Sequence, residues 1–315
     1  MIFLKKKAVV VVGATASGKT SLGVHIAKNF GGEVISADSM QIYKGMSIST
    51  AKPTMEEQRG IPHHLIDFLD ITEIYSVSAF CNDAKKVFDT ICENDKLPVI
   101  VGGTGLYVDS FLTNTSFLDN ANSEEIRTRL NNELKENGID FMYSQLKSID
   151  PEAADKIHPN NIVRVLRALE VYYSTGMTIT QQALMSHEVE TDIEPLFIGI
   201  TFKDREKLYE RINKRVDIMI QEGLWDEAEQ FFKSFPSVTA FNAIGCKELK
   251  PYFDGLKSAD ECIDDLKRST RRYAKRQLTW FKRNPDIHWI YRDEMNDYSV
   301  YVDDLINKFL VGETT

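Results

Sequence analysis

An unbroken apolar run, Ala8 to Val12, leads directly into a glycine-rich segment. A short apolar run predicts a strand buried on both faces, and the spacing of Leu22 and Ile26 behind it predicts a helix. The segment between them reads Gly-x-x-x-x-Gly-Lys-Thr, which indicates a P-loop, where backbone N–H groups and a helix N-terminus hold phosphate. Lys19 would reach the terminal phosphates and Thr20 would bind Mg²⁺. The expected phosphate-binding residues are Gly13, Ala14, Thr15, Ala16, Ser17, Gly18, Lys19 and Thr20.

Short apolar runs and helical stretches alternate over the first 110 residues. This alternation predicts an α/β fold, a P-loop NTPase-like parallel sheet with helices on both faces. The expected strands are Ala8–Val12, Glu33–Ser36, His64–Phe68 and Pro98–Val101, and the expected helices lie near Thr20–Asn29 and Ser78–Asn94.

The pattern becomes purely helical between residues 114 and 190, where Asn122 could cap one helix and Pro159 suits the first turn of another. Strand-like segments return at Leu196–Phe202 and His288–Tyr291. We therefore expect an α/β core made of residues 1–113 and 191–315, with residues 114–190 as an all-helical insertion domain.

Two segments follow expected strands, where ligands bind in parallel sheets. Asp38 could hold Mg²⁺ through water or accept a proton, and it could equally be a turn residue. Gly102-Gly-Thr-Gly105 could bring backbone close to a second ligand, with the Thr104 hydroxyl as donor, or it could be only a tight turn. No acid follows Val101, so if Asp38 does not supply the acid that binds Mg²⁺, the interpretation as an ordinary nucleoside triphosphatase loses support.

Charge is distributed unevenly along the chain. The whole chain carries a formal charge of −9, yet Lys267 to Arg283 contains eight Lys or Arg and no acid. Cations follow a phosphate backbone and aromatic rings stack on bases, so this run favours nucleic-acid contact over a solvated helix face. At helical spacing the ridge would comprise Arg268, Arg272, Lys275, Arg276, Lys282 and Arg283, with Tyr273, Trp280 and Phe281 interleaved.

The chain start is too short for a signal peptide, and the apolar run behind it is too short to span a bilayer. Four cysteines without a C-x-x-C pair suggest reduced thiols. We expect a cytoplasmic protein with no membrane partner.

These segments together resemble the tRNA dimethylallyltransferase family, whose members modify the adenosine beside certain anticodons. The resemblance covers about residues 8 to 290 in order, with small departures at Ala14, Ser49 and Cys246. The tail after Tyr291 lacks the Cys/His zinc finger of eukaryotic members, so the chain resembles the bacterial form. The matching segments are Gly13–Thr20, Asp38–Tyr43, Gly45-Met46, Thr50–Pro53, Pro62–Asp67, Gly102–Tyr107, Ile157–Asn160, Arg164–Glu170, Ala243–Lys247 and Thr270–Trp280.

The resemblance implies transfer of a dimethylallyl group from dimethylallyl diphosphate to the N6 amine of the adenosine 3′-adjacent to the anticodon, with release of diphosphate. Diphosphate would lie in the P-loop with Mg²⁺ as cofactor. Asp38 would take the proton of the amine, Thr104 would be the second catalytic residue, and Arg215 would hold diphosphate, with Arg211 as the other candidate.

The resemblance also implies contact with the tRNA anticodon stem-loop, over which the helical insertion would close, by a protein acting as a monomer. The implied contacts are Asp38, Ser39, Met40, Gln41, Thr104, Arg127, Arg164, Arg167, Asn242, Ala243, Ile244, Gly245, Cys246, Lys247, Lys275, Arg276, Gln277, Trp280 and Lys282.

Other functions remain open at this point. A P-loop small-molecule kinase or a prenyltransferase of free adenine nucleotides would share the phosphate site, but neither needs the basic run. A non-catalytic RNA-binding switch would need the basic run but not the carboxylate of Asp38.

Overall fold

The chain folds into two units in the computed structural model, which describes residues 5–113, 123–188, 191–295 and 297–313. One unit, here the core unit, comprises Met1–Leu112 and Asp192–Thr315. The other, the helical unit, comprises Thr113–Thr191. The core unit is thus assembled from two segments that are separated in sequence.

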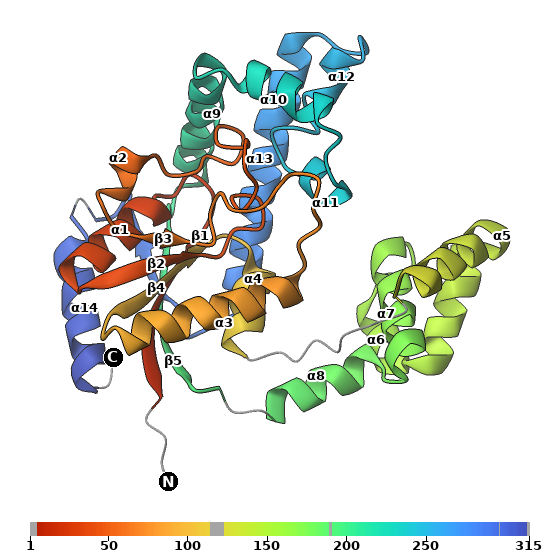
Figure 1. The fold of residues 1–315 in the computed structure, drawn as a ribbon, viewed down its shortest axis with the longest axis horizontal. Helices are drawn as coiled ribbons and strands as arrows, with labels where there is room; N and C mark the ends of the chain where they lie inside the picture. The colour runs from red at the N-terminus through yellow and green to blue at the C-terminus, as the bar shows by residue number, and fades with distance from the viewer. Residues whose placement is uncertain (1–4, 114–122, 189–190, 296, 314–315) are drawn as a thin grey trace. The chain divides into compact units, whose positions relative to one another are not determined.

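The core unit is built on a six-stranded parallel sheet, in the order β3-β2-β4-β1-β5-β6 (Figure 1). The apolar run of β1 lies at the centre, where Val9 pairs with Val99 of β4 and Leu196 of β5. Its valines are fully buried, as expected for a strand covered on both faces. The predicted parallel sheet is confirmed. The strands are β1 (Lys6–Gly13), β2 (Gly32–Ser36), β3 (His63–His64), β4 (Leu97–Gly102), β5 (Ile193–Thr201) and β6 (His288–Tyr291).

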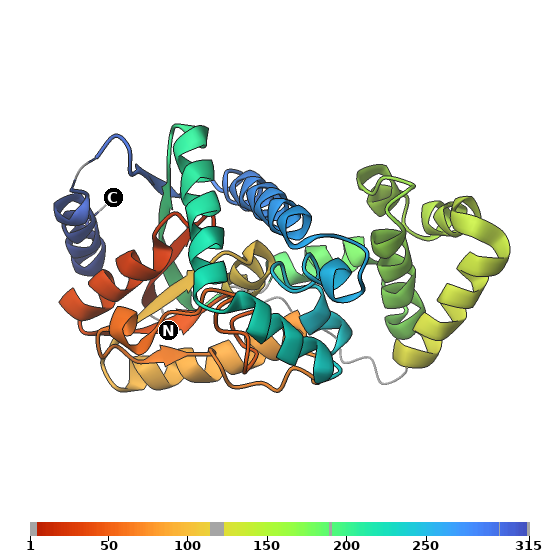
Figure 2. The same ribbon diagram turned by 90° about the horizontal axis from the view of Figure 1, so that it is seen from above.

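Helices cover both faces of this sheet. On one face Ile26 of α1 and Ile306 of α14 pack against Val9 and Val11, and both views of the ribbon draw α14 beside α1 (Figure 2). On the other face α3, α4 and α13 bury aromatic side chains against alternate residues of β1. The helices of the core unit are α1 (Lys19–Asn29), α2 (Met55–Gln58), α3 (Val77–Glu93), α4 (Gly105–Leu112), α9 (Arg205–Gln221), α10 (Leu224–Lys233), α11 (Val238–Phe241), α12 (Lys250–Phe253), α13 (Ala259–Phe281) and α14 (Ser299–Val311).

The helical unit has its own apolar core, formed by residues such as Leu130, Met142 and Leu169. The first turn of α7 is capped by the Asn161 side chain, which accepts from the Arg164 N–H at 3.3 Å. Pro159 precedes that cap, so its predicted place in the first helical turn is wrong; the predicted cap Asn122 lies outside the described residues. The helices are α5 (Ser123–Ile149), α6 (Pro151–Lys156), α7 (Ile162–Thr175) and α8 (Ile179–Glu188).

The edge strand β3 is much shorter than the predicted His64–Phe68. Leu65 and Asp67 have φ of 58° and 55°, in the left-handed region, and they end the extended backbone. The side chains of β3 are only half-buried, which fits an edge position.

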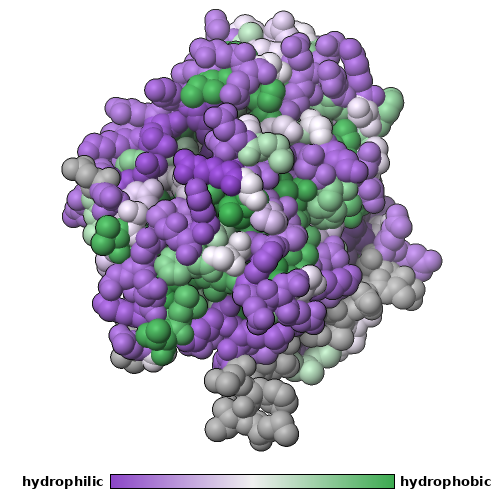
Figure 3. Space-filling model, turned by 60° about the vertical axis from the view of Figure 1, so that its left-hand side comes forward, coloured by the Kyte–Doolittle hydropathy of each residue, from purple (hydrophilic) through white to green (hydrophobic). Residues whose placement is uncertain are grey.

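Hydrophilic side chains cover most of the face drawn in Figure 3, with hydrophobic residues in small patches among them. Within the described residues, no helix is both long and apolar enough to cross a membrane.

Candidate active site

The P-loop connects β1 to α1 at the carboxyl edge of the sheet. Gly13 has a φ of 146°, and a Cβ there would lie 2.2 Å from the carbonyl oxygen of Ile200, so only glycine fits. Gly18 stands at the N-cap of α1 with no side-chain cap, which leaves the first N–H groups of the helix available to an anion.

Lys19 folds back over this loop, and its Nζ donates to the carbonyl oxygen of Ala14 at 2.8 Å. Burial lowers the pKa of Lys19 to about 8; Asp38 opposes this shift and Arg215 adds to it. The ammonium group of Lys19 is therefore poorly solvated, and a nearby phosphate oxygen would stabilise its charged form.

Three guanidinium groups surround the P-loop. Arg211 Nε donates to the carbonyl oxygen of Ala16 at 3.1 Å, and Arg215 Nη1 lies 3.4 Å from Thr15 Oγ1. Both predicted candidates for diphosphate binding thus contact the loop. Arg215 is the more buried of the two, and burial lowers its pKa.

The third guanidinium, that of Arg292, was not predicted from the sequence. Its Nη1 donates to the carbonyl oxygen of Ser17 at 3.1 Å. Arg292 directly follows β6, and its backbone N–H donates to Thr201 at the end of β5. Its position after a parallel strand was the one available signal.

Asp38 and Thr104 lie close together because β2 and β4 are adjacent. The N–H of Thr104 donates to the Ala37 carbonyl oxygen at 3.3 Å, and the N–H of Ser39 donates to Thr104 Oγ1 at 3.1 Å. A Cβ on Gly102 would lie 2.1 Å from the Ala37 carbonyl oxygen, so this close approach requires glycine.

The two oxygens of the Asp38 carboxylate differ in their hydrogen bonds. Oδ1 accepts from the N–H groups of Met40 and Gln41 at 2.9 and 3.3 Å, as the turn-residue interpretation expected. Among the residues that the structure describes, no hydrogen bond reaches Oδ2. One oxygen is therefore structural, and the other is open to a ligand.

Gln277 of α13 joins the two loops of the site. Its Nε2 donates to the Gly103 carbonyl oxygen at 3.0 Å, and its Oε1 accepts from the Thr15 N–H at 2.8 Å. The side chain is buried, with 4% exposed, so it does not lie on the predicted surface ridge.

The aromatic residues predicted to interleave with that ridge behave differently from one another. The guanidinium groups of Arg276 and Arg283 lie 5.7 and 4.1 Å from the ring centroids of Tyr273 and Trp280, as expected for interleaved residues. Phe281 is buried in the core, and Trp280 Nε1 donates to Asp109 Oδ2 at 2.8 Å. Tyr273 lines the cavities described below, and burial raises its pKa.

Part of the basic run from Lys267 to Arg283 is also neutralised. Lys267 pairs with Asp217 at 2.6 Å, and Arg268 pairs with Asp265 at 2.8 Å. The cations that stay well exposed on or just after α13 are Arg272, Lys275, Arg276, Lys282 and Arg283.

Two adjoining cavities lie beside these groups in the core unit. The larger, about 710 Å³, is lined by the P-loop and by cations that include Lys52, Arg211 and Lys214. The smaller, about 220 Å³, is lined by apolar residues such as Val216 and by part of the 242–247 turn. The residues that line both are Thr15, Asp38, Thr50, Arg215, Met219 and Tyr273.

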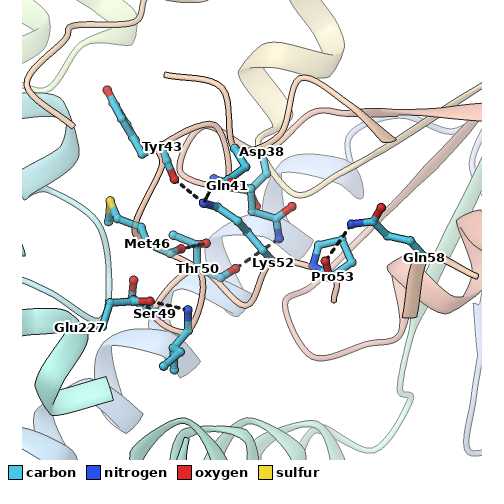
Figure 4. Close-up of polar contacts among 12 residues, drawn as sticks. Asp38, Gln41, Tyr43, Met46, Ser49, Thr50, Lys52, Pro53, Gln58 and Glu227 are labelled. Atoms are coloured by element: carbon cyan, nitrogen blue, oxygen red, sulfur yellow. Dashed lines mark hydrogen bonds and ion pairs between the residues drawn. The ribbon is translucent and has the colours of Figure 1, made fainter. Parts of the chain in front are cut away.

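The loop between β2 and α2 forms a wall of both cavities, and Figure 4 shows how it is held. Gln41 Nε2 donates to the carbonyl oxygens of Thr50 and Ala51 at 3.2 Å each, so its amide serves the loop itself. The carboxylate of Glu227 accepts from the N–H groups of Ile48 and Ser49 at 2.8 Å each (Figure 4). Glu227 is distant in sequence, and no local pattern could have identified it.

The predicted tRNA-contacting turn, residues 242–247, divides by exposure. Asn242 and Lys247 are exposed, whereas Gly245 and Cys246 are buried, and burial raises the pKa of the Cys246 thiol to about 12. Asn242, Ala243, Ile244 and Lys247 line the smaller cavity. In the helical unit Arg127, Arg164 and Arg167 are all exposed.

Comparison with known proteins shows which proteins this chain is similar to. The chain matches the family described as IPP transferase over residues 41–284. It is 48% identical over 294 residues to a tRNA dimethylallyltransferase of Acetivibrio thermocellus, which covers 91% of this chain and 92% of that protein.

Solved structures that resemble this chain are also tRNA prenyltransferases. The crystal structure of a full-length tRNA isopentenylpyrophosphate transferase from Bacillus halodurans is 42% identical, with a TM-score of 0.72 over 98% of this chain and 96% of that one. A eukaryotic dimethylallyltransferase acting on tRNA is 31% identical, with a TM-score of 0.81 over 98% of this chain and 80% of that one.

Proposed function

The chain belongs to the IPP transferase family, and we infer that it is a transferase that adds a prenyl group to tRNA. In finer detail, we propose that it moves a dimethylallyl group from dimethylallyl diphosphate to the N6 amine of the adenosine 3′-adjacent to the anticodon, releasing diphosphate. One observation carries this proposal: a cavity lined by the P-loop and by cations and a second, more apolar cavity meet at Asp38.

The diphosphate of the donor would occupy the larger cavity. The P-loop N–H groups, Lys19, Arg211 and Arg215 would bind its oxygens and stabilise the charge that develops as the allylic C–O bond breaks. Stabilisation of the leaving group is decisive here, because the allylic carbon ionises toward a cation as diphosphate departs.

A Mg²⁺ ion fits the same cavity. Mg²⁺ keeps several waters and binds substrate phosphates with one or two protein ligands, and Thr20 is among the residues that line this cavity. Among the described residues there is no cluster of three or more His, Cys, Asp or Glu, so no all-protein cage competes with that arrangement. When bound, Mg²⁺ would add positive charge beside the leaving diphosphate.

The acceptor is a weak nucleophile, because the lone pair of an exocyclic adenine amine is delocalised into the ring. Asp38 would take the amine proton through Oδ2 as the new C–N bond forms, while Oδ1 keeps the turn in place. The Thr104 hydroxyl, next to Ser39, would orient the amine.

The tRNA would contact both units. In the core unit we propose contacts from the exposed part of the 242–247 turn and from Lys275, Arg276 and Lys282. In the helical unit we propose contacts from Arg127, Arg164 and Arg167. We also propose that the protein acts as a monomer and that it is located in the cytoplasm.

Mass spectrometry of an anticodon stem-loop RNA tests this proposal. The RNA is incubated with the protein, dimethylallyl diphosphate and Mg²⁺, and one adenosine should gain a single five-carbon unit. Parallel reactions contain free adenine nucleotide as acceptor, or ATP alone. Prenylation of the free nucleotide only, or rapid ATP hydrolysis with unmodified RNA, would contradict the proposal.

A further inference from the structure

Among the described residues of the helical unit, the buried carboxylates are those of Asp150, which caps α6, and Glu170 on α7. Only 6% of the Glu170 side chain is exposed. Arg127 of α5 donates to it through Nη2 at 2.8 Å, and Nη1 of Arg167 lies 3.1 Å away. A buried carboxylate needs such partners, because it has lost its hydration.

The burial of this cluster is asymmetric. The side chains of Arg127 and Arg167 are 60% and 52% exposed, although the anion between them is almost fully covered. Each guanidinium carries five N–H donors, and the contact with Glu170 occupies only part of them. The carboxylate therefore holds two guanidinium groups side by side at the surface while their remaining donors stay accessible.

An ordinary surface ion pair looks different. In the same unit Lys156 and Glu152 pair at 2.7 Å with both side chains well exposed, 70% and 62%. The two charges of such a pair cancel, and the pair contributes little to the stability of the fold. The Glu170 cluster combines two cations with one anion, so it keeps a net positive charge and a fixed geometry.

We propose that Glu170 is a positioning residue for RNA binding, which holds Arg127 and Arg167 as a paired clamp for the phosphate backbone of the substrate RNA. The inference rests on the proposed contact between the helical unit and tRNA. A guanidinium held in place offers phosphate a paired set of donors, whereas a freely rotating one must be ordered upon binding.

The substitution Glu170→Gln separates this role from simple charge. It removes a negative charge beside two arginines and so makes the cluster more positive. If net charge alone mattered, RNA binding should become tighter. Positioning predicts the opposite: tRNA affinity about five- to tenfold weaker, a flatter salt dependence, and an unchanged kcat at saturating tRNA. Glu152→Gln is the matched control, because it removes the same charge without affecting the arginines, and it should not weaken binding.

A combined variant tests whether Glu170 acts through the arginines. In a chain with Arg127→Ala and Arg167→Ala, adding Glu170→Gln should leave tRNA affinity unchanged. An equal loss in both backgrounds, or tighter binding by the single Glu170→Gln variant, would overturn the proposal.

Circular dichroism of each full-length variant shows whether the helical unit is folded. If Glu170→Gln unfolds it, a chain with Arg127→Lys and Arg167→Lys decides, because it keeps Glu170 and both charges but loses the planar donor set. Several-fold weaker tRNA binding by that chain would support the clamp, and unchanged binding would overturn it. These assays measure RNA binding directly, so a wild-type chain that binds tRNA without prenylating it would contradict the proposed function and leave the clamp standing.

Discussion

The core unit and the helical unit position their functional side chains in different ways. In the core unit, Thr15, Gly103 and Gln277 come from three distant segments and are joined by direct hydrogen bonds. In the helical unit, Arg127 and Arg167 need only two packed helices and one buried carboxylate. The difference matches the proposed tasks, because bond formation requires reacting atoms to be placed within a fraction of an ångström, whereas a phosphate backbone is a repetitive and more tolerant target.

If this comparison is right, changes at the interlinked, largely buried residues of the core unit should mainly affect turnover, and changes at exposed cations of either unit should mainly affect tRNA binding. The largest effect is expected at Asp38. Asp38→Ala and Asp38→Asn should each lower kcat by about 10²–10⁴, because the amine loses its proton acceptor. Asn retains an oxygen for the N–H groups of Met40 and Gln41, so the two variants separate chemistry from loop structure.

The measurement for Asp38 is single-turnover prenylation, with tRNA affinity determined separately and expected to stay near normal. Asp70→Asn is the control, since Asp70 also accepts from a backbone N–H in a turn, that of Thr72 at 2.9 Å, but lines neither cavity. Equal losses of affinity and turnover would make Asp38 an RNA-positioning residue instead.

A smaller effect on turnover is expected at Gln277. In Gln277→Glu the carboxylate can still accept from the Thr15 N–H but can no longer donate to the Gly103 carbonyl oxygen, so two oxygens face each other in a buried place. We expect kcat/KM for dimethylallyl diphosphate to fall about 10- to 100-fold, with tRNA affinity unchanged. Gln230→Glu is the control, because it adds the same charge on the exposed face of α10, and it should have no effect. A loss of tRNA affinity alone in Gln277→Glu would indicate that Gln277 contacts RNA instead of positioning the loops.

The exposed cations of α13 provide the converse test. Reversal of Arg272 and Arg276 to Glu should weaken tRNA binding about 10- to 30-fold at low salt and flatten the salt dependence, with kcat at saturating tRNA little changed. The control is a chain with Lys233→Glu and Lys308→Glu, which makes the same charge change at exposed sites on α10 and α14. In this control the salt dependence of tRNA affinity should be the same as in the wild-type chain. An unchanged slope in the α13 variant would locate the RNA contact elsewhere.

The smallest effect is a pH dependence of donor binding. Lys19 has a pKa lowered to about 8, so it is charged below that pH and increasingly neutral above it. The KM for dimethylallyl diphosphate should therefore rise between pH 8 and 9, by up to about tenfold. A Lys19→Arg variant stays charged throughout, and its KM, though higher, should be flat over this range; the same rise in both chains would exclude Lys19 as the cause.

The sequence predicted those parts of the fold whose signal is local. The apolar run of β1 and the glycine pattern behind it defined the sheet centre and the P-loop, and β6 was predicted with its observed bounds. The extent of β3 was predicted wrongly, because left-handed backbone at Leu65 and Asp67 depends on the surrounding loop and leaves no periodic trace.

Site residues fixed by distant partners could not be predicted in the same way. Gln277 shares its buried helix stripe with Ala274 and Phe281, but only loops from elsewhere in the chain satisfy its amide. Glu227 and Arg292 likewise act on loops that are distant in sequence. For Gln277 the sequence offered one signal, a polar residue in an apolar stripe, and for Arg292 another, a position directly after a parallel strand. For Glu227 it offered none.

The hydrogen bond between Lys19 and the carbonyl oxygen of Ala14 also bears on the end of the catalytic cycle. A lysine whose only hydrogen-bond acceptor was the ligand would be left poorly solvated and without a partner whenever pyrophosphate dissociated, and this would slow dissociation. Lys19 instead has an internal acceptor to which it can return. If diphosphate binds at Lys19 as proposed, exchange between these two partners would lower the barrier to product departure and leave the lysine in place for the next donor molecule.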